Sequence, residues 1–363
     1  MQSERPTIPM GSWSVFSEGD ALYGEMLRDI AKASHSVRIE SYILVADQIG
    51  TRFLSELAQA ASRGVSVAMR VDHAGSFFTL PNAHIRGLRA SGVDFRWSRR
   101  WTWRYPWRLN RRNHRKLLIV DESSAYLGGF NIHESSSLRV HGPSRWRDTH
   151  LRFDGPLVAA ATAIFDACRE QRGQPVSATE AIEGRRLIPN STRSCRRVWR
   201  CAVNDAVRAA RSRIWVTTPY FVPDHRLQAQ LIRAARQGVD VRLLVPAKSD
   251  VVLAQWAARA AYSSLLEAGV RIFEYAPRVL HAKTMLVDHT WASLGTANID
   301  YRSFFVNDEI NLTDATGELN GVMERLFNRD LEESVEIRFA PWRRRPWTSW
   351  LTESIGWVMR RWL

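Results

Sequence analysis

Cysteine is scarce in this chain of 363 residues, and no apolar segment is long. The three cysteines, Cys168, Cys195 and Cys201, are odd in number and lack metal-ligand spacing, which disfavours structural disulfides and fits a reducing compartment. Residues 1–23 have no apolar run of the signal-peptide kind. The most apolar stretch, residues 156–165, is shorter than the roughly 20 residues that cross a bilayer. Any membrane attachment is therefore expected to be peripheral.

Lysine is also rare. Only four of the 51 basic side chains are lysines, namely Lys32, Lys116, Lys248 and Lys283. The formal net charge of +14 favours a polyanionic partner, either nucleic acid or an anionic membrane. The 15 tryptophans favour the membrane, because tryptophan concentrates at membrane–water interfaces. Zinc-ligand spacings and a P-loop are absent, so the sequence predicts neither a metal nor another cofactor.

One short pattern occurs twice, and each copy contains one of the rare lysines. Histidine, lysine, aspartate and asparagine recur with a 17-residue span from His to Asn in both copies, which start 167 residues apart. The two copies are His114, Lys116, Asp121 and Asn131, and His281, Lys283, Asp288 and Asn298. Because whole spacings match, chance is disfavoured, and the pair predicts one active site built from two half-sites. A site that needs a compact charge on a phosphate oxygen would keep lysine where arginine is otherwise the default cation.

The two halves share a plan beyond this pattern. Residues 37–45, 50–62 and 65–71 have the composition of a strand, a helix and a strand, and residues 213–222, 227–236 and 239–245 repeat that order. Alternating strands and helices predict the α/β class, with a mixed, mostly parallel sheet flanked by helices in each half. The expected divisions are a first repeat over residues 1–175, a linker over 176–197, a second repeat over 198–338 and a basic tail over 339–363.

Two tryptophan-rich segments lie outside the repeat. Trp101, Trp103 and Trp107 alternate with arginines just before the first motif, so this segment is expected at the rim of the site. The tail carries Trp347, Trp350 and Trp357 in a basic amphipathic pattern. The pattern favours a helix that lies in a membrane interface, with these six tryptophans as contacts. The alternative is a C-terminal helix packed on the core with a solvated basic edge, since amphipathicity serves both.

The doubled pattern resembles the phospholipase D superfamily, whose motif is HxKxxxxD followed by a small-residue turn with asparagine. The resemblance implies two repeats related by a pseudo-two-fold axis and a metal-free, ping-pong displacement at phosphorus. It implies that His114 is the nucleophile and His281 the general acid and base. Lys116, Lys283, Asn131 and Asn298 would hold the non-bridging phosphate oxygens.

The resemblance also bears on the carboxylates. Glu309 resembles the acidic partner that orients a histidine in the family, and Asp148 looks like its counterpart in the first half. Asp121 and Asp288 belong to the motif and so to the candidate catalytic set. Their positions at strand ends favour a bracing role, in which they pair with arginine rather than touch substrate.

Further segments resemble bacterial cardiolipin synthases. These begin at Ile39, Asn110, Trp146, Thr218 and Arg302. The resemblance implies phosphatidyl transfer at the cytoplasmic side of the inner membrane, typically between two phosphatidylglycerols that act as donor and acceptor, with no obligate protein partner. Another phospholipid donor, and phosphatidylethanolamine or a small alcohol as second substrate, stay open. A hydrolytic phospholipase D would have the same motifs. A nuclease of the superfamily would use basic and aromatic side chains for phosphate contact and stacking, although nucleic acid is the less favoured partner. A non-catalytic basic scaffold is disfavoured because both motif copies are complete.

Overall fold

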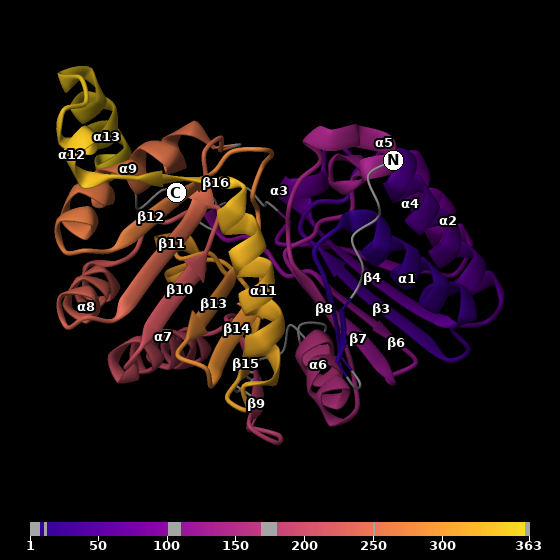
Figure 1. The fold of residues 1–363 in the computed structure, drawn as a ribbon. Coiled ribbons are helices and arrows are strands. Elements are labelled where there is room, and N and C mark those ends of the chain that lie inside the picture. Colours follow the sequence, from indigo (N-terminus) through magenta and orange to yellow (C-terminus); the bar gives the residue numbers. More distant parts are fainter. Residues whose placement is uncertain (1–7, 11–12, 101–109, 168–179, 250, 360–363) are drawn as a thin grey trace.

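The structure, a computed structural model, describes residues 8–10, 13–100, 110–167, 180–249 and 251–359. Two eight-stranded sheets stand side by side, each covered by helices (Figure 1). The first sheet has the order β1 (Ile8–Met10), β2 (Trp13–Phe16), β8 (His150–Asp154), β7 (Ser124–Gly128), β6 (Leu117–Val120), β3 (Ser36–Ser41), β4 (Ser66–Asp72) and β5 (Asp94–Ser98).

The second sheet repeats this arrangement. Its order is β16 (Ser334–Ile337), β12 (Arg271–Tyr275), β11 (Asp240–Pro246), β10 (Arg213–Thr217), β13 (Thr284–Val287), β14 (Trp291–Gly295), β15 (Ile310–Asp314) and β9 (Arg185–Pro189). The series β5-β4-β3-β6-β7-β8-β2 of the first half thus corresponds to β12-β11-β10-β13-β14-β15-β9 of the second. The expected class, two α/β repeats with mixed sheets, is confirmed.

The expectation that each sheet is mostly parallel is wrong. Between the strands that the structure describes, parallel pairing joins only β3, β4 and β5 in one sheet and β10, β11 and β12 in the other. The remaining neighbours are antiparallel, including the motif strands β6 and β13 with their neighbours on both sides. A helical crossover produces parallel pairing, whereas β6–β7 and β13–β14 are joined by tight turns that reverse the chain.

Helices cover the outer faces of the sheets and also fill the space between the two halves (Figure 1). Those of the first half are α1 (Gly19–Lys32), α2 (Gln48–Ser62), α3 (His73–Ser76), α4 (Asn82–Ala90), α5 (Leu138–His141) and α6 (Pro156–Ala167). Those of the second are α7 (Arg193–Ala209), α8 (His225–Arg236), α9 (Val252–Glu267), α10 (Tyr301–Phe305), α11 (Glu318–Glu332), α12 (Phe339–Arg343) and α13 (Trp347–Met359). Asp47 and Asp224 cap α2 and α8 through their carboxylates, and the glycines that follow these helices, Gly64 and Gly238, have positive φ.

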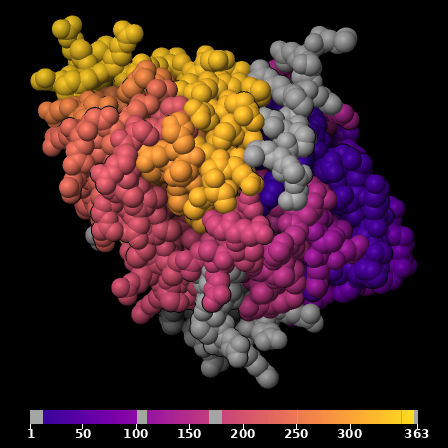
Figure 2. All heavy atoms as spheres, turned by 60° about the horizontal axis from the view of Figure 1, so that its bottom comes forward, coloured from indigo at the N-terminus to yellow at the C-terminus, as the bar shows by residue number. Residues whose placement is uncertain are grey.

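Each half has an outer apolar core, and a third core lies between the halves. The shared core combines side chains of the first sheet and α6, such as Leu151 and Phe165, with Trp215, Leu326 and Phe327 of the second half. Where grey atoms do not cover the boundary in Figure 2, atoms of the two halves adjoin. The halves are therefore packed together as one unit rather than tethered.

Two features concern the expected divisions and the membrane. The range 176–197 assigned to a linker contains β9, which pairs with β15, and the start of α7. The range assigned to the tail forms α12 and α13, and α13 packs on α9. Among the residues that the structure describes, no helix combines the length and the apolar character needed to cross a membrane.

Candidate active site

The two motifs meet where the repeats are joined by backbone hydrogen bonds. The amide of His114 donates to the carbonyl of Asp308 at 2.9 Å, and the amide of His281 donates to the carbonyl of Arg147 at 2.7 Å. Each histidine thus enters its motif strand beside a segment of the other repeat. This reciprocal pairing brings the two half-sites into one place, as the repeated pattern predicts.

Each histidine takes its carboxylate partner from the opposite repeat. Nδ1 of His114 lies 3.0 Å from Oε2 of Glu309, and Nδ1 of His281 lies 2.5 Å from Oδ2 of Asp148. Both carboxylates are fully buried and ionised, so they can only accept. Nδ1 of each ring therefore donates, and Nε2 of a neutral ring keeps its lone pair for chemistry.

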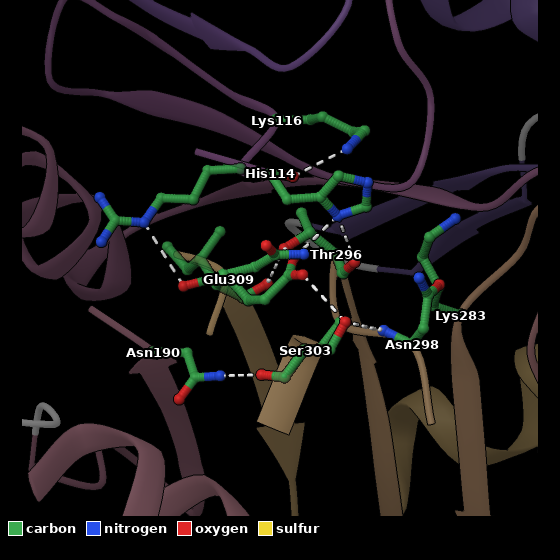
Figure 3. A network of polar contacts seen from close by, with 12 residues as sticks. His114, Lys116, Asn190, Lys283, Thr296, Asn298, Ser303 and Glu309 are labelled. Atoms are coloured by element: carbon green, nitrogen blue, oxygen red, sulfur yellow. Dashed lines mark hydrogen bonds and ion pairs between the residues drawn. The ribbon is translucent and has the colours of Figure 1, made fainter. Parts of the chain in front are cut away.

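The carboxylate of Glu309 lies at the centre of a polar network (Figure 3). Thr296 donates its hydroxyl to Oε2 at 2.6 Å, and Ser303 donates its hydroxyl to Oε1 at 3.0 Å. Ser303 in turn accepts the amide of Asn298 at 3.0 Å, and its carbonyl accepts the side-chain amide of Asn190. The network fixes Glu309, and through it the ring of His114, in one orientation.

The two motif lysines are buried beside the histidines. Nζ of Lys116 donates to the carbonyl of His114 at 2.7 Å, and Nζ of Lys283 donates to the carbonyl of His281. Burial, together with the charge of Lys283, lowers the pKa of Lys116 to about 7. Two ammonium groups that repel each other in one buried site create a position where an anion is favoured.

The same burial keeps His114 neutral. Burial lowers the pKa of His114 to about 4, against the opposing charge of Glu309 and with the help of Lys116. Burial alone would raise the pKa of both Glu309 and Asp148, but the cationic groups around them outweigh it and hold both values below the usual range. At neutral pH the site therefore contains a neutral imidazole held by an ionised carboxylate, which is the state that a nucleophile requires.

The motif asparagines lie in the same buried region. Asn131 accepts the amide of Ile43 through Oδ1 at 3.1 Å, which leaves its NH₂ group available to a ligand. Asn298 is almost fully buried, and its Oδ1 has no hydrogen-bond partner among the described residues. Their role as phosphate ligands stays a prediction.

Asp121 and Asp288 do not join the site. Asp121 follows β6 at the end remote from Lys116 and accepts the amides of Ser34, His35 and Ser36 at 2.8–2.9 Å. Asp288 accepts the amides of residues 211–213 in the same way, at 2.8–3.1 Å. The expected bracing function is therefore present, but the partners are backbone amides and not arginine side chains. A four-residue strand separates each from its lysine, so both lie outside the buried cluster of histidines and lysines.

Two aromatic side chains that the sequence analysis did not single out contact the histidines. Tyr42 lies 4.7 Å from the ring of His114, and Trp146 lies 5.3 Å from the ring of His281. Thr296 and Ser303 were likewise not assigned roles. All four lie within or beside the segments that resemble the family, and this position was the only indication of a role that the sequence offered. Their contacts with the histidines and carboxylates depend on how one repeat packs against the other.

The six tryptophans expected at the membrane divide into two groups. Trp101, Trp103 and Trp107 lie outside the described residues. On α13, Trp347 is 76% and Trp350 55% exposed, whereas Trp357 is half-buried with its ring 5.7 Å from that of His225. Of the three tail tryptophans expected at the membrane, Trp347 and Trp350 therefore face outward.

Comparisons with known proteins agree with this geometry. Residues 26–143 and 203–331 match the family described as "Cardiolipin synthase, PLD-like domain". A cardiolipin synthase of Geobacillus thermodenitrificans is 33% identical over 97% of this chain and 72% of its own length. Cardiolipin synthase A of Pseudomonas syringae pv. syringae is 32% identical over 92% of this chain and 71% of its own length.

Solved structures show the same fold. A phosphatidylserine synthase of Haemophilus influenzae superposes with a TM-score of 0.74 and 12% identity, covering 98% of this chain and 96% of that one. The fold and the site formed by the two His–Lys motifs define a phospholipase D-like enzyme. The chain belongs to the cardiolipin synthase family of this superfamily.

Proposed function

We propose that the protein transfers a phosphatidyl group from one phosphatidylglycerol to another, giving cardiolipin and glycerol, without a metal. The observation that carries the proposal is the crosswise pair of histidine–carboxylate units, His114–Glu309 and His281–Asp148, which enclose two buried lysines. The names of the relatives support the lipid substrate, and the site supports displacement at a phosphodiester.

The proposed reaction has two displacements. In the first, Nε2 of His114 attacks phosphorus, a P–N bond forms, and the P–O bond to the headgroup glycerol breaks as His281 donates its proton to the departing oxygen. In the second, His281 removes the proton from a hydroxyl of the acceptor lipid. That oxygen attacks phosphorus, a new P–O bond forms, and the P–N bond breaks to restore His114.

The buried charges support both steps. Negative charge builds up on the non-bridging oxygens as each nucleophile adds, and the buried ammonium groups of Lys116 and Lys283 would offset it. Asp148, 2.5 Å from His281, would balance the positive charge of the imidazolium form. No reorganisation of these groups is needed, because the structure holds them in place before substrate binds.

We further propose an anionic membrane as the partner, with the protein attached peripherally at the cytoplasmic side. The outward face of α13 supports this proposal. Besides Trp347 and Trp350, it exposes Leu351, Ile355 and Val358 at 43–73%. The carboxylate of Glu353, the single acidic residue in this helix, is buried and paired with Arg345 at 2.7 Å, so it places no negative charge on the exposed face.

The test uses purified protein and phosphatidylglycerol vesicles in the presence of a chelator, with the lipids resolved by mass spectrometry. We expect cardiolipin and free glycerol from the wild type and none from His114→Ala. Phosphatidic acid as the only product would contradict the lipid acceptor and indicate a hydrolase. The absence of any lipid product would contradict the proposal as a whole and direct attention to nucleic acid substrates.

A further inference from the structure

An arginine without a close carboxylate partner among the described residues lies two positions before His114. Most arginines around the site have carboxylate partners. These pairs are Arg99 and Arg111 with Asp308, Arg115 with Glu40, Arg147 with Asp330, and Arg145 and Arg278 with Glu18. Arg112 differs. Among the described residues it forms no ion pair, and its guanidinium makes only a 3.5 Å contact with the carbonyl of Arg111.

The position of Arg112 follows from the alternation of an extended segment. Asn113 and Arg115 turn toward Glu40, at 3.0 and 3.8 Å, while His114 and Lys116 turn toward the reactive centre. Arg112 therefore lies on the same face as His114. Its Cα is separated from that of His114 by about 6.7 Å, as expected for two residues of extended chain.

Two polar groups accompany Arg112. The ring of Tyr42 contacts that of His114, and no described residue forms a hydrogen bond with its hydroxyl. Arg302 donates to the side chain and carbonyl of Asn110 and so holds the segment that leads into Arg112. Burial raises the pKa of Tyr42 and lowers that of Arg302, and the charge of Arg112 acts on both, which places the three groups close together.

The other half of the pseudo-symmetric site has no such group. The carbonyls of Arg112 and Val279 accept equivalent backbone hydrogen bonds, from Asp308 and Arg147, so Val279 occupies the position equivalent to Arg112. Arg302 lies four residues after Asn298, and Ser135 lies four residues after the equivalent Asn131, so Arg302 corresponds to Ser135.

Tyr42 has an apolar counterpart as well. The bond from Ser41 to the carbonyl of Ile43 is repeated by Thr218 and Tyr220, so Tyr42 corresponds to Pro219. The two half-sites thus share the histidine and the lysine, but only the His114 half-site is accompanied by the hydroxyl of Tyr42 and the cations of Arg112 and Arg302. Because the His281 half-site lacks these groups, displacement at a single phosphorus does not require them.

We propose that Tyr42, Arg112 and Arg302 form a second anion subsite, which binds the phosphodiester of the acceptor phospholipid while its headgroup hydroxyl attacks the phosphatidyl group on the enzyme. The proposal rests on the proposed function. Arginine suits a phosphodiester because its planar fork matches two oxygens.

The chemistry of the product agrees with two neighbouring phosphate subsites. The two phosphorus atoms of cardiolipin are joined by the short bridge P–O–C–C–C–O–P, so the acceptor phosphate stays close to the phosphorus that reacts. Binding the acceptor phosphate at the second subsite would hold the hydroxyl near the reactive phosphorus and favour it over water or a free alcohol.

An apolar surface lies next to this subsite. Phe77 and Phe78, just after α3, are 48% and 92% exposed, and the ring of His73 contacts that of Phe77 at 4.7 Å. Burial lowers the pKa of His73, and the charges of Arg100 and Arg112 add to this effect, which places Arg112 near these rings. Such a border suits an acceptor that carries acyl chains rather than a water-soluble phosphate.

The test measures two products in one mixture. Purified protein receives phosphatidylglycerol in mixed micelles with added ethanol, and mass spectrometry quantifies cardiolipin, which needs an anionic lipid acceptor, and phosphatidylethanol, which needs none. For Arg112→Gln we expect cardiolipin formation to fall roughly 10- to 100-fold while phosphatidylethanol formation is unchanged. Tyr42→Phe should change the same ratio by about 3- to 10-fold.

The control and the contradicting outcomes are defined by the same ratio. Arg52→Gln removes an equal charge from the exposed face of α2 and should leave both products unchanged. An equal loss of both products in Arg112→Gln would overturn the subsite and assign Arg112 to the donor phosphate, and no change in either product would also overturn it. If the wild type forms phosphatidylethanol but no cardiolipin, the proposed function itself fails, a result that is visible before any variant is compared.

Discussion

At the scale of single residues, the two histidine–carboxylate pairs are alike in geometry but differ in their surroundings. Glu309 accepts hydroxyl groups from Thr296 and Ser303 in addition to His114. Asp148 is one methylene shorter, and its Oδ1 accepts the amide of Thr149 at 2.7 Å. The position equivalent to Thr296 is Gly129, where an added Cβ would lie 2.0 Å from Oδ1 of Asp148. Gly129 is therefore required at this position, because a side chain there would overlap with the carboxylate of Asp148.

Gly129→Ala tests this steric requirement. Its Cβ would push Asp148 away from Nδ1 of His281, so we expect kcat to fall by about 100-fold or more, with a smaller effect on the amount of folded protein. Phosphatidyl transfer and circular dichroism are measured on the same preparation. Gly87→Ala is the matched control, since nothing lies within 4 Å of its added Cβ on α4. A Gly129→Ala enzyme with wild-type kcat would contradict the account.

The pH dependence should reflect Lys116. Its pKa of about 7 in the free protein means that the charged form is present below pH 7 and is lost above it. We therefore expect kcat/KM to decline above about pH 7. Because a bound phosphodiester favours the ammonium form, the decline of kcat should occur at higher pH than that of kcat/KM.

His114 should not impose an acid limb in the same range. With a pKa of about 4 it stays neutral from pH 5 upward. Rate profiles between pH 5 and 10 test both statements. Coincident basic limbs in kcat and kcat/KM would contradict the assignment of the limb to a lysine that contacts the phosphate.

At the scale of elements, the motif strands are positioned by the aspartates at their far ends. Asp121 and Asp288 adopt left-handed backbone conformations, with φ of 51° and 50°, and each accepts amides from the start of the neighbouring strand, β3 or β10. The HxKxxxxD motif thus spans a strand that has the histidine and lysine at one end. At its other end the aspartate acts as a clamp, because it bonds the motif strand to the start of the neighbouring strand.

Asp121→Ala should therefore act on stability. Loss of the acceptor for three amides is expected to lower the free energy of unfolding by about 1–2 kcal/mol, by analogy with the loss of a helix cap. Asp121→Asn keeps one acceptor oxygen and tolerates positive φ, so its loss should be smaller. Urea unfolding measures both. If Asp121→Asn and Asp121→Ala abolish turnover without changing stability, the clamp function is wrong.

Helix α13 provides the second prediction at this scale. Leu351→Glu combined with Val358→Glu places charges on its outward face, so binding to anionic vesicles should weaken by about 10-fold or more. Activity on lipid in detergent micelles should persist. Val335→Glu alters an exposed valine on β16 and is the control. Unchanged vesicle sedimentation of the double variant would contradict the membrane proposal.

How far the sequence predicts these elements depends on the range of the interactions. The alternation that places His114 and Lys116 on one face is local, as is the helix α2 that ends two residues before Gly64, and both were predictable. The antiparallel pairing of β6 and β13 was not, because hydrophobic runs do not reveal strand direction. The crosswise pairing of His114 with Glu309 joins residues 195 positions apart and depends on how the repeats dock.

At the scale of the whole molecule, the site exists only because the two halves form one unit. Besides the shared core, Glu18 of the first half accepts from Arg145 at 2.7 Å and from Arg278 of the second half at 2.8 Å. Burial alone would raise the pKa of Glu18, but the bonds to Arg278 and Arg145 outweigh it and lower the pKa below its usual value. This contribution to stability is present above the unfolded-state pKa and is lost as the pH falls through the folded-state value.

Glu18→Gln should destabilise the whole molecule. It keeps the shape of the side chain but leaves two largely buried arginines without a counter-charge, so we expect the free energy of unfolding to fall by about 3–5 kcal/mol. Glu25→Gln, which breaks the solvent-exposed pair with Arg28, should cost under about 0.5 kcal/mol. Denaturant titration compares the two. Equal effects would show that the Glu18 cluster does not hold the halves together.

The central claim is that one composite site passes a phosphatidyl group through a histidine. The most direct measurement is the exchange of isotopically labelled glycerol into phosphatidylglycerol, combined with mass spectrometry of peptides from acid-free quenched enzyme. The account predicts exchange by the wild type and a phosphatidyl adduct on the peptide that contains His114, both lost in His114→Ala. Cardiolipin formation by the wild type without glycerol exchange and without an adduct on either histidine would contradict it.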